Sequence, residues 1–511
     1  MDKKHTGDPF RKSICFTLLV LLSIGALSCK KTLDVNSTHL ATEEKQWKSI
    51  TDTRSGLVGI YGLFRAALAD NNAHWLFGEL RNGDFVSFSR SDMSAIHEGN
   101  LNASFPMMEQ LKNWRRFYAV INSASVFIER APEVHQIDPL YTDVNLKIDI
   151  AQARALRAFA YFYMVRIWGD VPLITSSHDN GSFEARPRSD KDIVLAFAEN
   201  ELLAAAQDLP YKYGVAPAEY YNETEGRWNG VLFTKNSAYA ILAHLAAWKG
   251  NYLNADVYSD FVMNNYSKSS IDYTTVEELT SADGFFNGKN AKQMVAFNFV
   301  DGHGESTASG HLEQLTLAQP LVLKQNPEIF VPKDSISIIF NDPENRDIRF
   351  GIDTISGLVR TNYFTNYSGA TPIFSKLKVL RGGTTEGNFA IFGSAIVFSR
   401  LEDMVLLRAE SLAVLGRIDE AAALLNSIRN RRSLSSIIPE SAEELINEIF
   451  AERRRELMGE GHRWYDQVRY HKIMQRDAAF QELISKQGIY WPLAAEALSN
   501  NAALEQNTYW N

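Results

Sequence analysis

The chain has 511 residues, of which 45% are hydrophobic and 22% are charged, so it can build a large core and is not generally disordered. Its formal net charge of −9 excludes a broadly basic surface, and we expect no nucleic-acid partner. The two cysteines, Cys15 and Cys29, both lie near the N-terminus, which excludes a disulfide framework and a thiolate metal cluster in the rest of the chain.

The N-terminus has the pattern of an export signal. A mostly apolar run from Ile14 to Leu27 follows the basic residues Lys3, Lys4, Arg11 and Lys12. The run is shorter than the roughly 20 residues that a membrane-spanning helix needs. Residues 26–29, Ala-Leu-Ser-Cys, resemble a bacterial lipobox, although the usual Leu three residues before the cysteine is Ala. We expect a lipoprotein signal peptide over residues 1–28 and a lipid anchor on Cys29. The alternative is an ordinary cleavable signal followed by an incidental cysteine.

Apolar residues at three- and four-residue steps predict long helices in the first half of the mature chain. Leu57, Ile60 and Phe64 form one such stripe. The predicted helices cover residues 53–69, 114–128, 151–168 and 191–209. The third is rich in alanine and ends at Gly169, with Pro172 beyond it, which is typical of a helix terminus.

Two later segments repeat one design: a helix, a glycine break and a second helix. Gly250 breaks residues 237–263 and Gly416 breaks residues 400–432, each with an alanine about five residues further on. The glycine ends one helix and the alanine lets the next approach closely, as in tetratricopeptide hairpins. No regular repeat period runs along the chain. We therefore expect a mainly α fold, in which degenerate tetratricopeptide-like hairpins form a frame that carries irregular loops and a few short strands.

Three stretches lack helical periodicity and are rich in turn-forming residues: 70–103, 211–232 and 266–399. Short apolar runs at 293–300 and 336–340 predict strands. We divide the mature domain, residues 29–511, into an N-terminal half (29–230), a helical hairpin (231–265), a loop-rich insert (266–399) and a C-terminal helical part (400–511). Loops mounted on a rigid frame are where binding residues usually lie.

Four sequence blocks, in this order along the chain, resemble those of a known family. The first is RALRAFAYF at residues 154–162, with GDVPL at 169–173. The second is RLEDMVLLRAESL at 400–412, with NSIRNR at 426–431. The third is ERRREL at 452–457, with EGHRWYD at 460–466, and the last is YWPL at 490–493, with QNTY at 506–509.

On these blocks the chain resembles the SusD/RagB family of outer-membrane lipoproteins from Bacteroidetes. It departs from the family in the tail, where Pro-Ile-Pro has become Pro-Leu-Ala and the terminal Gly is Thr508. The resemblance implies a SusD-like fold without enzymatic activity, lipid-anchored in the outer membrane and facing the cell exterior. It further implies capture of an oligosaccharide and its delivery to a SusC-like TonB-dependent transporter. The alternatives are capture of a peptide, as by RagB-like members, and hydrolysis of a glycan.

The third block carries opposite charges at helical spacing. We expect a structural ion-pair network of Glu452, Arg453, Glu456, Glu460, Arg463 and Asp466 that fixes helix packing. The rival interpretation is an acid/base pair for glycoside hydrolysis, but this many arginines would lower the pKa that a general acid needs raised. No HExxH, P-loop or GxGxxG motif occurs, and no two histidines are four apart. We expect no catalytic machinery, no metal and no cofactor.

A sugar site would combine an exposed ring with planar polar side chains. Three groups in irregular stretches qualify as candidate ligand contacts: Trp75 with Arg81, Asn82 and Asp84; Trp228 with Tyr221; and Tyr363 and Tyr367 with Asn362. The alternative for each ring is burial against the helical frame.

Overall fold

The computed structural model describes residues 46–178, 184–214, 220–228, 230–352, 359–360, 362–382 and 390–511. The chain divides into two compact units, Met1–Lys48 and Ser49–Asn511, and the second contains every element named below. The predicted signal peptide, residues 1–28, and the lipidation site Cys29 lie outside the described residues. Among the helices that are described, none has the length and apolar character to cross a membrane.

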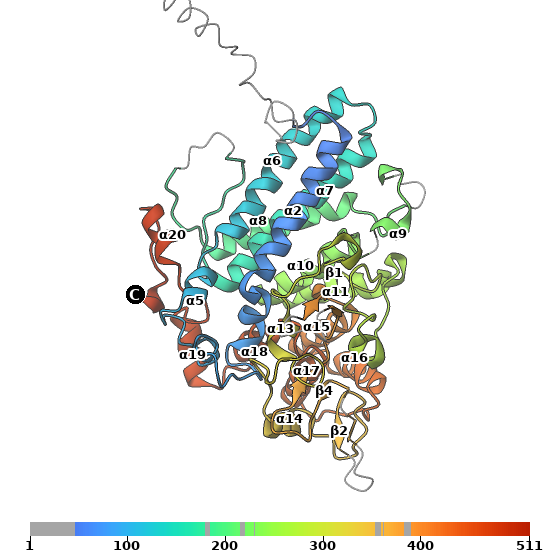
Figure 1. The fold of residues 1–511 in the computed structure, drawn as a ribbon, viewed down its shortest axis with the longest axis vertical. Helices are drawn as coiled ribbons and strands as arrows, with labels where there is room; N and C mark the ends of the chain where they lie inside the picture. The colour runs from blue at the N-terminus through green and yellow to red at the C-terminus, as the bar shows by residue number, and fades with distance from the viewer. Residues whose placement is uncertain are drawn as a thin grey trace, which may run out of the picture. The chain divides into compact units, whose positions relative to one another are not determined.

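Four long helices form the N-terminal half, and helices consecutive in this set pack side by side (Figure 1). They are α2 (Ile50–Ala69), α6 (Arg115–Ile137), α7 (Asp143–Trp168) and α8 (Lys191–Asp208). Helix α7 packs on both α6 and α8, and nearly every side chain from Ala151 to Trp168 is buried. The alanines of this segment let the neighbouring helices approach closely.

All four predicted helices are present, and two of their boundaries differ from the prediction by more than three residues. Helix α6 continues past the expected end at residue 128, with Pro132 inside it. Helix α7 begins before residue 151, because Thr142 caps it by accepting a hydrogen bond from the Asn145 amide. In the first turns of α7, residues 143–150, apolar and polar residues alternate, so no apolar stripe at helical spacing revealed them.

Two helical hairpins continue the frame. They are α10 (Lys235–Lys249) with α11 (Tyr252–Asn265), and α15 (Leu401–Val414) with α16 (Ile418–Arg431). Gly250 and Gly416 turn the chain at φ 78°, where a side chain would be strained. Ala255 and Ala421 are fully buried in the second helices, and α11 packs on α15. The prediction of a mainly α fold with tetratricopeptide-like hairpins is confirmed.

Shorter helices complete the unit. Those before residue 270 are η2 (Asp70–Asn72), α3 (Ala73–Trp75), the π-helix η3 (Leu76–Leu80), α4 (Ser91–His97), α5 (Pro106–Leu111), η4 (Tyr220–Asn222), α9 (Glu225–Trp228) and η5 (Tyr266–Ser269). Those after it are α12 (Val276–Thr280), η6 (Asp301–His303), α13 (Leu312–Thr316), α14 (Lys333–Ile339), α17 (Ala442–Glu456), α18 (Arg463–Met474), α19 (Ala478–Ser485), α20 (Ala495–Asn500) and η7 (Thr508–Trp510). The stretch 70–103, expected to be irregular, is therefore partly helical.

The strands form two-stranded antiparallel sheets. Strand β1 (Val295–Phe297) pairs with β8 (Ile396–Ser399), β2 (Gly351–Ile352) with β3 (Val359–Arg360), β4 (Phe364–Thr365) with β5 (Ile373–Phe374), and β6 (Leu380–Gly382) with β7 (Ile391–Phe392). The strand predicted within residues 293–300 is confirmed. The strand predicted at 336–340 is wrong: this run lies mostly in helix α14, where Ile336 and Ile339 are buried at helical spacing and Ile338 is 72% exposed.

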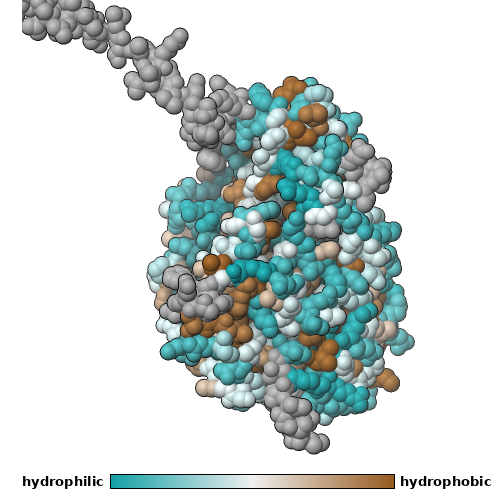
Figure 2. All heavy atoms as spheres, turned by 45° about the vertical axis from the view of Figure 1, so that its right-hand side comes forward, coloured by the Kyte–Doolittle hydropathy of each residue, from teal (hydrophilic) through white to brown (hydrophobic). Residues whose placement is uncertain are grey.

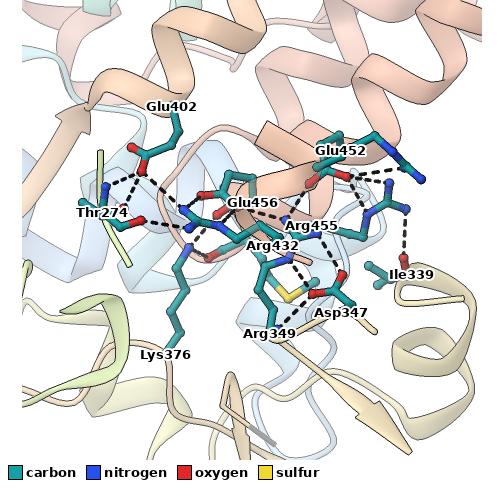
Figure 3. A network of polar contacts seen from close by, with 12 residues as sticks. Thr274, Ile339, Asp347, Arg349, Lys376, Glu402, Arg432, Glu452, Arg455 and Glu456 are labelled. Carbon is teal, nitrogen blue, oxygen red and sulfur yellow. Dashed lines mark hydrogen bonds and ion pairs between the residues drawn. The ribbon is translucent and has the colours of Figure 1, made fainter. Parts of the chain in front are cut away.

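A buried cluster of charges fastens the insert to the C-terminal helices (Figure 3). The carboxylate of Glu456, at the end of α17, accepts hydrogen bonds from Arg349 at 2.9 Å, Arg400 at 2.9 Å and Arg432 at 2.6 Å. Arg349 belongs to the insert, whereas Arg400 precedes α15 and Arg432 follows α16. One carboxylate thus ties together three segments that are distant in sequence, and all of these side chains are at most 1% exposed.

Lys376, also from the insert, closes the end of α17. Its ammonium group donates to the carbonyl oxygens of Glu456 at 2.9 Å and Met458 at 3.0 Å, and to the Glu460 carboxylate at 2.5 Å. The last carbonyl groups of a helix lack partners within the helix and form the negative end of its dipole. The Lys376 ammonium therefore donates hydrogen bonds to carbonyl groups that are buried out of reach of water.

Five of the six side chains proposed for the ion-pair network lie in buried ion pairs. Glu452 contacts Arg349 and Arg455, and Glu456 contacts the three arginines above. Arg453 contacts Asp403 and Asp466. Glu460 contacts Lys376 and Arg400. Arg463 differs from these five. Its nearest carboxylate, that of Asp84, is 3.5 Å away, and its side chain makes no hydrogen bond within the described residues.

The pKa values of these carboxyl groups oppose a catalytic role. Burial alone would raise the pKa of Glu452, but Arg349 and Arg455 lower it to about 2. Neighbouring cations likewise overcome burial and lower the pKa of Glu456 and of Glu460. A general acid must be protonated near neutral pH, and these groups are ionised there.

Replacing Glu456 by Gln should destabilise the protein strongly, because it removes the negative charge that three buried guanidinium groups share. Breaking a buried ion pair costs about 3–5 kcal/mol, and we expect a loss of this size in the free energy of unfolding measured by urea titration. The matched control, Glu443→Gln, removes an exposed pair with Arg476 and should cost less than about 1 kcal/mol. Equal losses in the two variants would contradict the role assigned to Glu456.

Candidate functional site

Two cavities lie beside helix α2. The larger, about 410 Å³, is called the Asn71 cavity, and its walls include Asp70, Asn71, Asn72, Arg116, Thr307 and Gln314. The smaller, about 250 Å³, is called the Trp228 cavity, and its walls include Arg54, Tyr61, Arg65, Trp228, Asn298 and Glu305. Both cavities use α2 and the chain that follows β1, so they form two parts of one candidate site.

A left-handed turn at the end of α2 shapes the Asn71 cavity. Asn71 and Asn72 have φ values of 53° and 56°, in the left-handed region. Asparagine enters this region more readily than most residues with a side chain. Two such residues in succession store strain, and strained backbone clusters at binding and active sites. The turn places both amide side chains at the cavity wall.

Six side chains that line the Asn71 cavity carry planar polar groups: Asp70, Asn71, Asn72, Arg90, Arg116 and Gln314. Arg116 pairs with Asp70 at 2.7 Å, and both side chains are about two-fifths exposed. The Asn71 amide donates to Gln110 at 2.7 Å. Gln314 Oε1 accepts from Asn72 at 3.2 Å, which leaves the Gln314 amide nitrogen without a hydrogen bond among the described residues. Amides and guanidinium groups held in this way can bind the hydroxyl, amide or carboxylate groups of a ligand.

Arg65 stands between the two cavities. Its guanidinium lies 4.9 Å from the centre of the Phe299 ring and pairs with Glu305 at 2.8 Å. It also donates to the carbonyl oxygen of Asn298 at 2.6 Å. Because Phe299 lines the Asn71 cavity and Asn298 lines the Trp228 cavity, Arg65 fixes the wall that the two share.

An aromatic cluster supports the Trp228 cavity. Trp228 packs on Tyr220 and lies under the guanidinium of Arg54, which is 5.2 Å from the indole ring. The indole nitrogen of Trp228 is buried without a hydrogen-bond partner among the described residues. Tyr220 and Tyr221 both donate to the carboxylate of Asp149. The wall of the Trp228 cavity therefore holds one buried donor without a hydrogen-bond partner among the described residues.

The expectation of an exposed platform around Trp75 is wrong. Trp75 is 2% exposed, because the π-helix that follows it is buried against α18. Arg81 is equally buried, donates to the carbonyls of Gly488 and Ile489, and stacks on Trp464. Asp84 is buried beneath Arg454, and only Asn82 is exposed. This group connects the N-terminal half to the C-terminal helices and lines neither cavity of the candidate site.

The group in the insert does not form the site either. Tyr363 is fully buried, with the Lys376 ammonium 4.8 Å from its ring centre, so it cannot stack on a ligand. Tyr367 is half-buried against Phe350, and Asn362 is exposed. Of the proposed aromatic contacts, Trp228 alone lines the candidate site; it is 6% exposed, and the neighbouring Tyr221 is half-buried.

Sequence reasoning missed the polar residues of the Asn71 cavity. The run Asp70-Asn71-Asn72 at the end of an amphipathic helix was a visible signal, because Asp and Asn favour turns. Arg116 and Gln314 carried no such signal, since their place beside this turn depends on the packing of α6 and of the insert against α2.

A largely exposed aromatic ring lies in the loop that leads to Arg90 of the Asn71 cavity. Phe88 is 76% exposed and stacks on Phe330 with ring centres 4.2 Å apart, so one face is supported and the ring is largely open to solvent. Arg90, two residues later, lines the cavity. The face drawn in Figure 2 is mainly hydrophilic, with hydrophobic residues gathered in separate groups, the largest of them toward the lower left. Within the described residues, no group of three or more His, Cys, Asp or Glu side chains could hold a metal ion.

Comparisons with known proteins agree on one family. The model of the SusD family matches residues 382–483. The SusD-like protein P38 of Formosa agariphila is 28% identical, over 97% of this chain and 99% of that protein. A crystal structure of a SusD superfamily protein from Bacteroides thetaiotaomicron is 50% identical, with a TM-score of 0.84, over 91% of this chain and all of that one. A structure described as a putative sugar binding protein from Bacteroides vulgatus, 18% identical with a TM-score of 0.69, shares the fold over 91% of this chain and 99% of that one.

The pH dependence of stability should report on Asp149, behind the Trp228 cavity. Burial raises the pKa of Asp149 to about 6 from 3.8, although hydrogen bonds from three tyrosines oppose the shift. A carboxyl group whose pKa is higher in the folded than in the unfolded protein stabilises the fold fully at pH values below its unfolded-state pKa. This stabilisation is lost as the pH rises through its folded-state pKa. Relative to Asp149→Asn, the wild-type free energy of unfolding should therefore fall by about 3 kcal/mol between about pH 4 and pH 7. Parallel pH profiles would contradict this assignment.

Proposed function

The chain belongs to the SusD family, and from this premise we propose that it captures an oligosaccharide at the cell surface and delivers it to a SusC-like TonB-dependent transporter in the outer membrane. The site proposed for capture is the pair of cavities beside α2. The observation that supports a saccharide most directly is the set of planar amide and guanidinium groups around the Asn71 cavity. Such groups match the hydroxyl pattern of a sugar.

The protein is a binding protein and not an enzyme, as is general in this family of non-catalytic binding proteins. The arginine-rich block that could have suggested glycoside hydrolysis carries carboxyl groups with lowered pKa values instead. Purified protein should therefore release no reducing ends from a glycan that it binds.

Membrane attachment is proposed from the N-terminal sequence. Residues 1–28 would be removed as a signal peptide and Cys29 would carry the lipid. A lipid anchor on the outer membrane would keep the protein beside its transporter and facing the exterior.

Peptide capture is the second candidate function, and one observation favours it. Three of the four Phe, Tyr and Trp rings that line the two cavities are buried: Phe299 and Trp228 are each 6% exposed, and Phe297 is 2% exposed, whereas Tyr61 is half-buried. A site with polar groups and few open rings also suits the backbone amides of a peptide. Binding to an array of immobilised oligosaccharides and to a peptide library would separate the two candidates.

Replacing Arg116 by Gln should weaken ligand binding. The substitution removes a charge-assisted donor from the Asn71 cavity and should reduce affinity roughly tenfold or more, as measured by calorimetry with the oligosaccharide selected on the array. Arg115→Gln is the matched control, because it removes the same charge from the preceding residue, which does not line this cavity. Equal affinity of wild type and Arg116→Gln would rule out the Asn71 cavity as the site.

Phe88 offers a test of the ligand class. If the ligand is a saccharide that reaches this loop, Phe88→Ala should reduce its affinity roughly five- to tenfold, because stacking on the open ring is lost. Ile338→Ala, at a residue exposed to a similar extent in the insert, should leave it unchanged. An unchanged affinity in Phe88→Ala would show that the loop lies outside the saccharide site.

A further inference from the structure

A separate cavity of about 470 Å³ lies between α17 and α18. Its walls include Asn82, Asn447, Phe450, Arg454, Arg463 and Gln467, and we call it the Arg463 cavity. It shares no lining residue with the Asn71 and Trp228 cavities. Its volume lies within the range of small-molecule sites.

The charges around this cavity are not balanced. Arg454 Nε donates to both carboxylate oxygens of Asp84, each at 3.0 Å. The same carboxylate is 3.5 Å from Arg463, which makes no hydrogen bond through its side chain within the described residues. Two guanidinium groups thus share one carboxylate. Their side chains are 29% and 22% exposed, whereas that of Asp84 is 5% exposed, so the surface they present to the cavity is positive.

The other acidic groups near Arg463 cannot supply the missing charge. Asp466 lines the cavity, but its oxygens accept hydrogen bonds from Arg453 and Arg469. Burial raises the pKa of Glu79 to about 8, which leaves that group mostly protonated at neutral pH. Arg463 is also the first residue of α18, and a cation at a helix N-terminus is unfavourable. A bound anion would balance the excess positive charge of the two arginines and would also offset the unfavourable position of Arg463 at the helix N-terminus.

The remaining walls indicate more than a bare anion. Tyr470 donates to Asn447 at 2.8 Å and packs edge-on against Phe450, so a phenol and an amide face the cavity together. Gln467 is held by the carbonyl of Asn82 at 2.7 Å. Rings and planar amides beside a guanidinium pair are suited to a sugar ring that carries an acidic group.

We propose that the Arg463 cavity is a second binding site, which takes an acidic saccharide through its carboxylate or sulfate group. Arg463 and Arg454 bind the oxyanion, while Asn447, Gln467 and Tyr470 contact the sugar. The site operates independently of the cavities beside α2.

Calorimetry at constant ionic strength tests this proposal with four probes: D-glucuronate, glucose 6-sulfate, glucose and inorganic sulfate. D-glucuronate and glucose 6-sulfate should both bind, and glucose should bind at least tenfold more weakly. Tighter binding of D-glucuronate would indicate a carboxylate site, and tighter binding of glucose 6-sulfate would indicate a sulfate site. Arg463→Gln should lose binding at least tenfold, whereas Arg346→Gln, at an exposed arginine of the insert, should not change it. If inorganic sulfate binds as tightly as glucose 6-sulfate, the saccharide assignment is overturned. If Arg463→Gln binds as well as wild type, the site is overturned.

A second variant keeps the test decisive if Arg463→Gln does not fold. Gln467→Glu places a carboxylate four residues after Arg463 on the same helix, where it can pair with the guanidinium. This variant should abolish binding of the acidic sugars and raise the thermal unfolding midpoint. Undiminished binding in Gln467→Glu would overturn the proposal.

Discussion

The carboxylate of Glu456 is the point on which the architecture depends. Arg349, Arg400 and Arg432 converge on it from three segments that are far apart in the sequence. Each of these charges was taken out of water, a cost of several kcal/mol per ion that is offset only while all partners stay in place. The insert therefore cannot shift relative to α17 without leaving buried charges unpaired, and a long loop-rich segment gains a fixed position that its small sheets alone would not provide.

That fixed position determines the candidate site, although no residue of the charge cluster touches it. Strand β8 leads directly into Arg400 and pairs with β1. Strand β1 continues into Asn298 and Phe299, which Arg65 of α2 holds through a hydrogen bond and a cation–π contact. The wall between the two cavities is thus connected, through one short sheet, to the buried arginines. Binding groups on a rigid support lose less conformational entropy when a ligand arrives.

The long helices and hairpins were predictable because their information is local: apolar stripes, terminal glycines and close-approach alanines lie within one segment. The ion-pair block was recognisable for the same reason, since its charges recur at four-residue spacing. The aromatic contacts failed because exposure is a tertiary property. Trp75 and Tyr363 lie in stretches that lack helical periodicity in the sequence, yet both side chains are buried in the structure. Arg463 shows the opposite case. Its motif predicted an ion pair, but in the structure the neighbouring carboxylate of Asp84 is hydrogen-bonded to Arg454.

The same distinction explains why the family is easier to recognise than the ligand. The matched family region, residues 382–483, contains Arg400, Arg432 and Glu456. It therefore includes most of the buried charges that fix the helical frame. The polar residues that line the Asn71 cavity lie between Asp70 and Gln314, outside that region. The charges that hold the frame and the polar groups proposed to bind the ligand are therefore different residues. Because fold and site depend on separate residues, the resemblance in fold identifies the family without identifying the ligand.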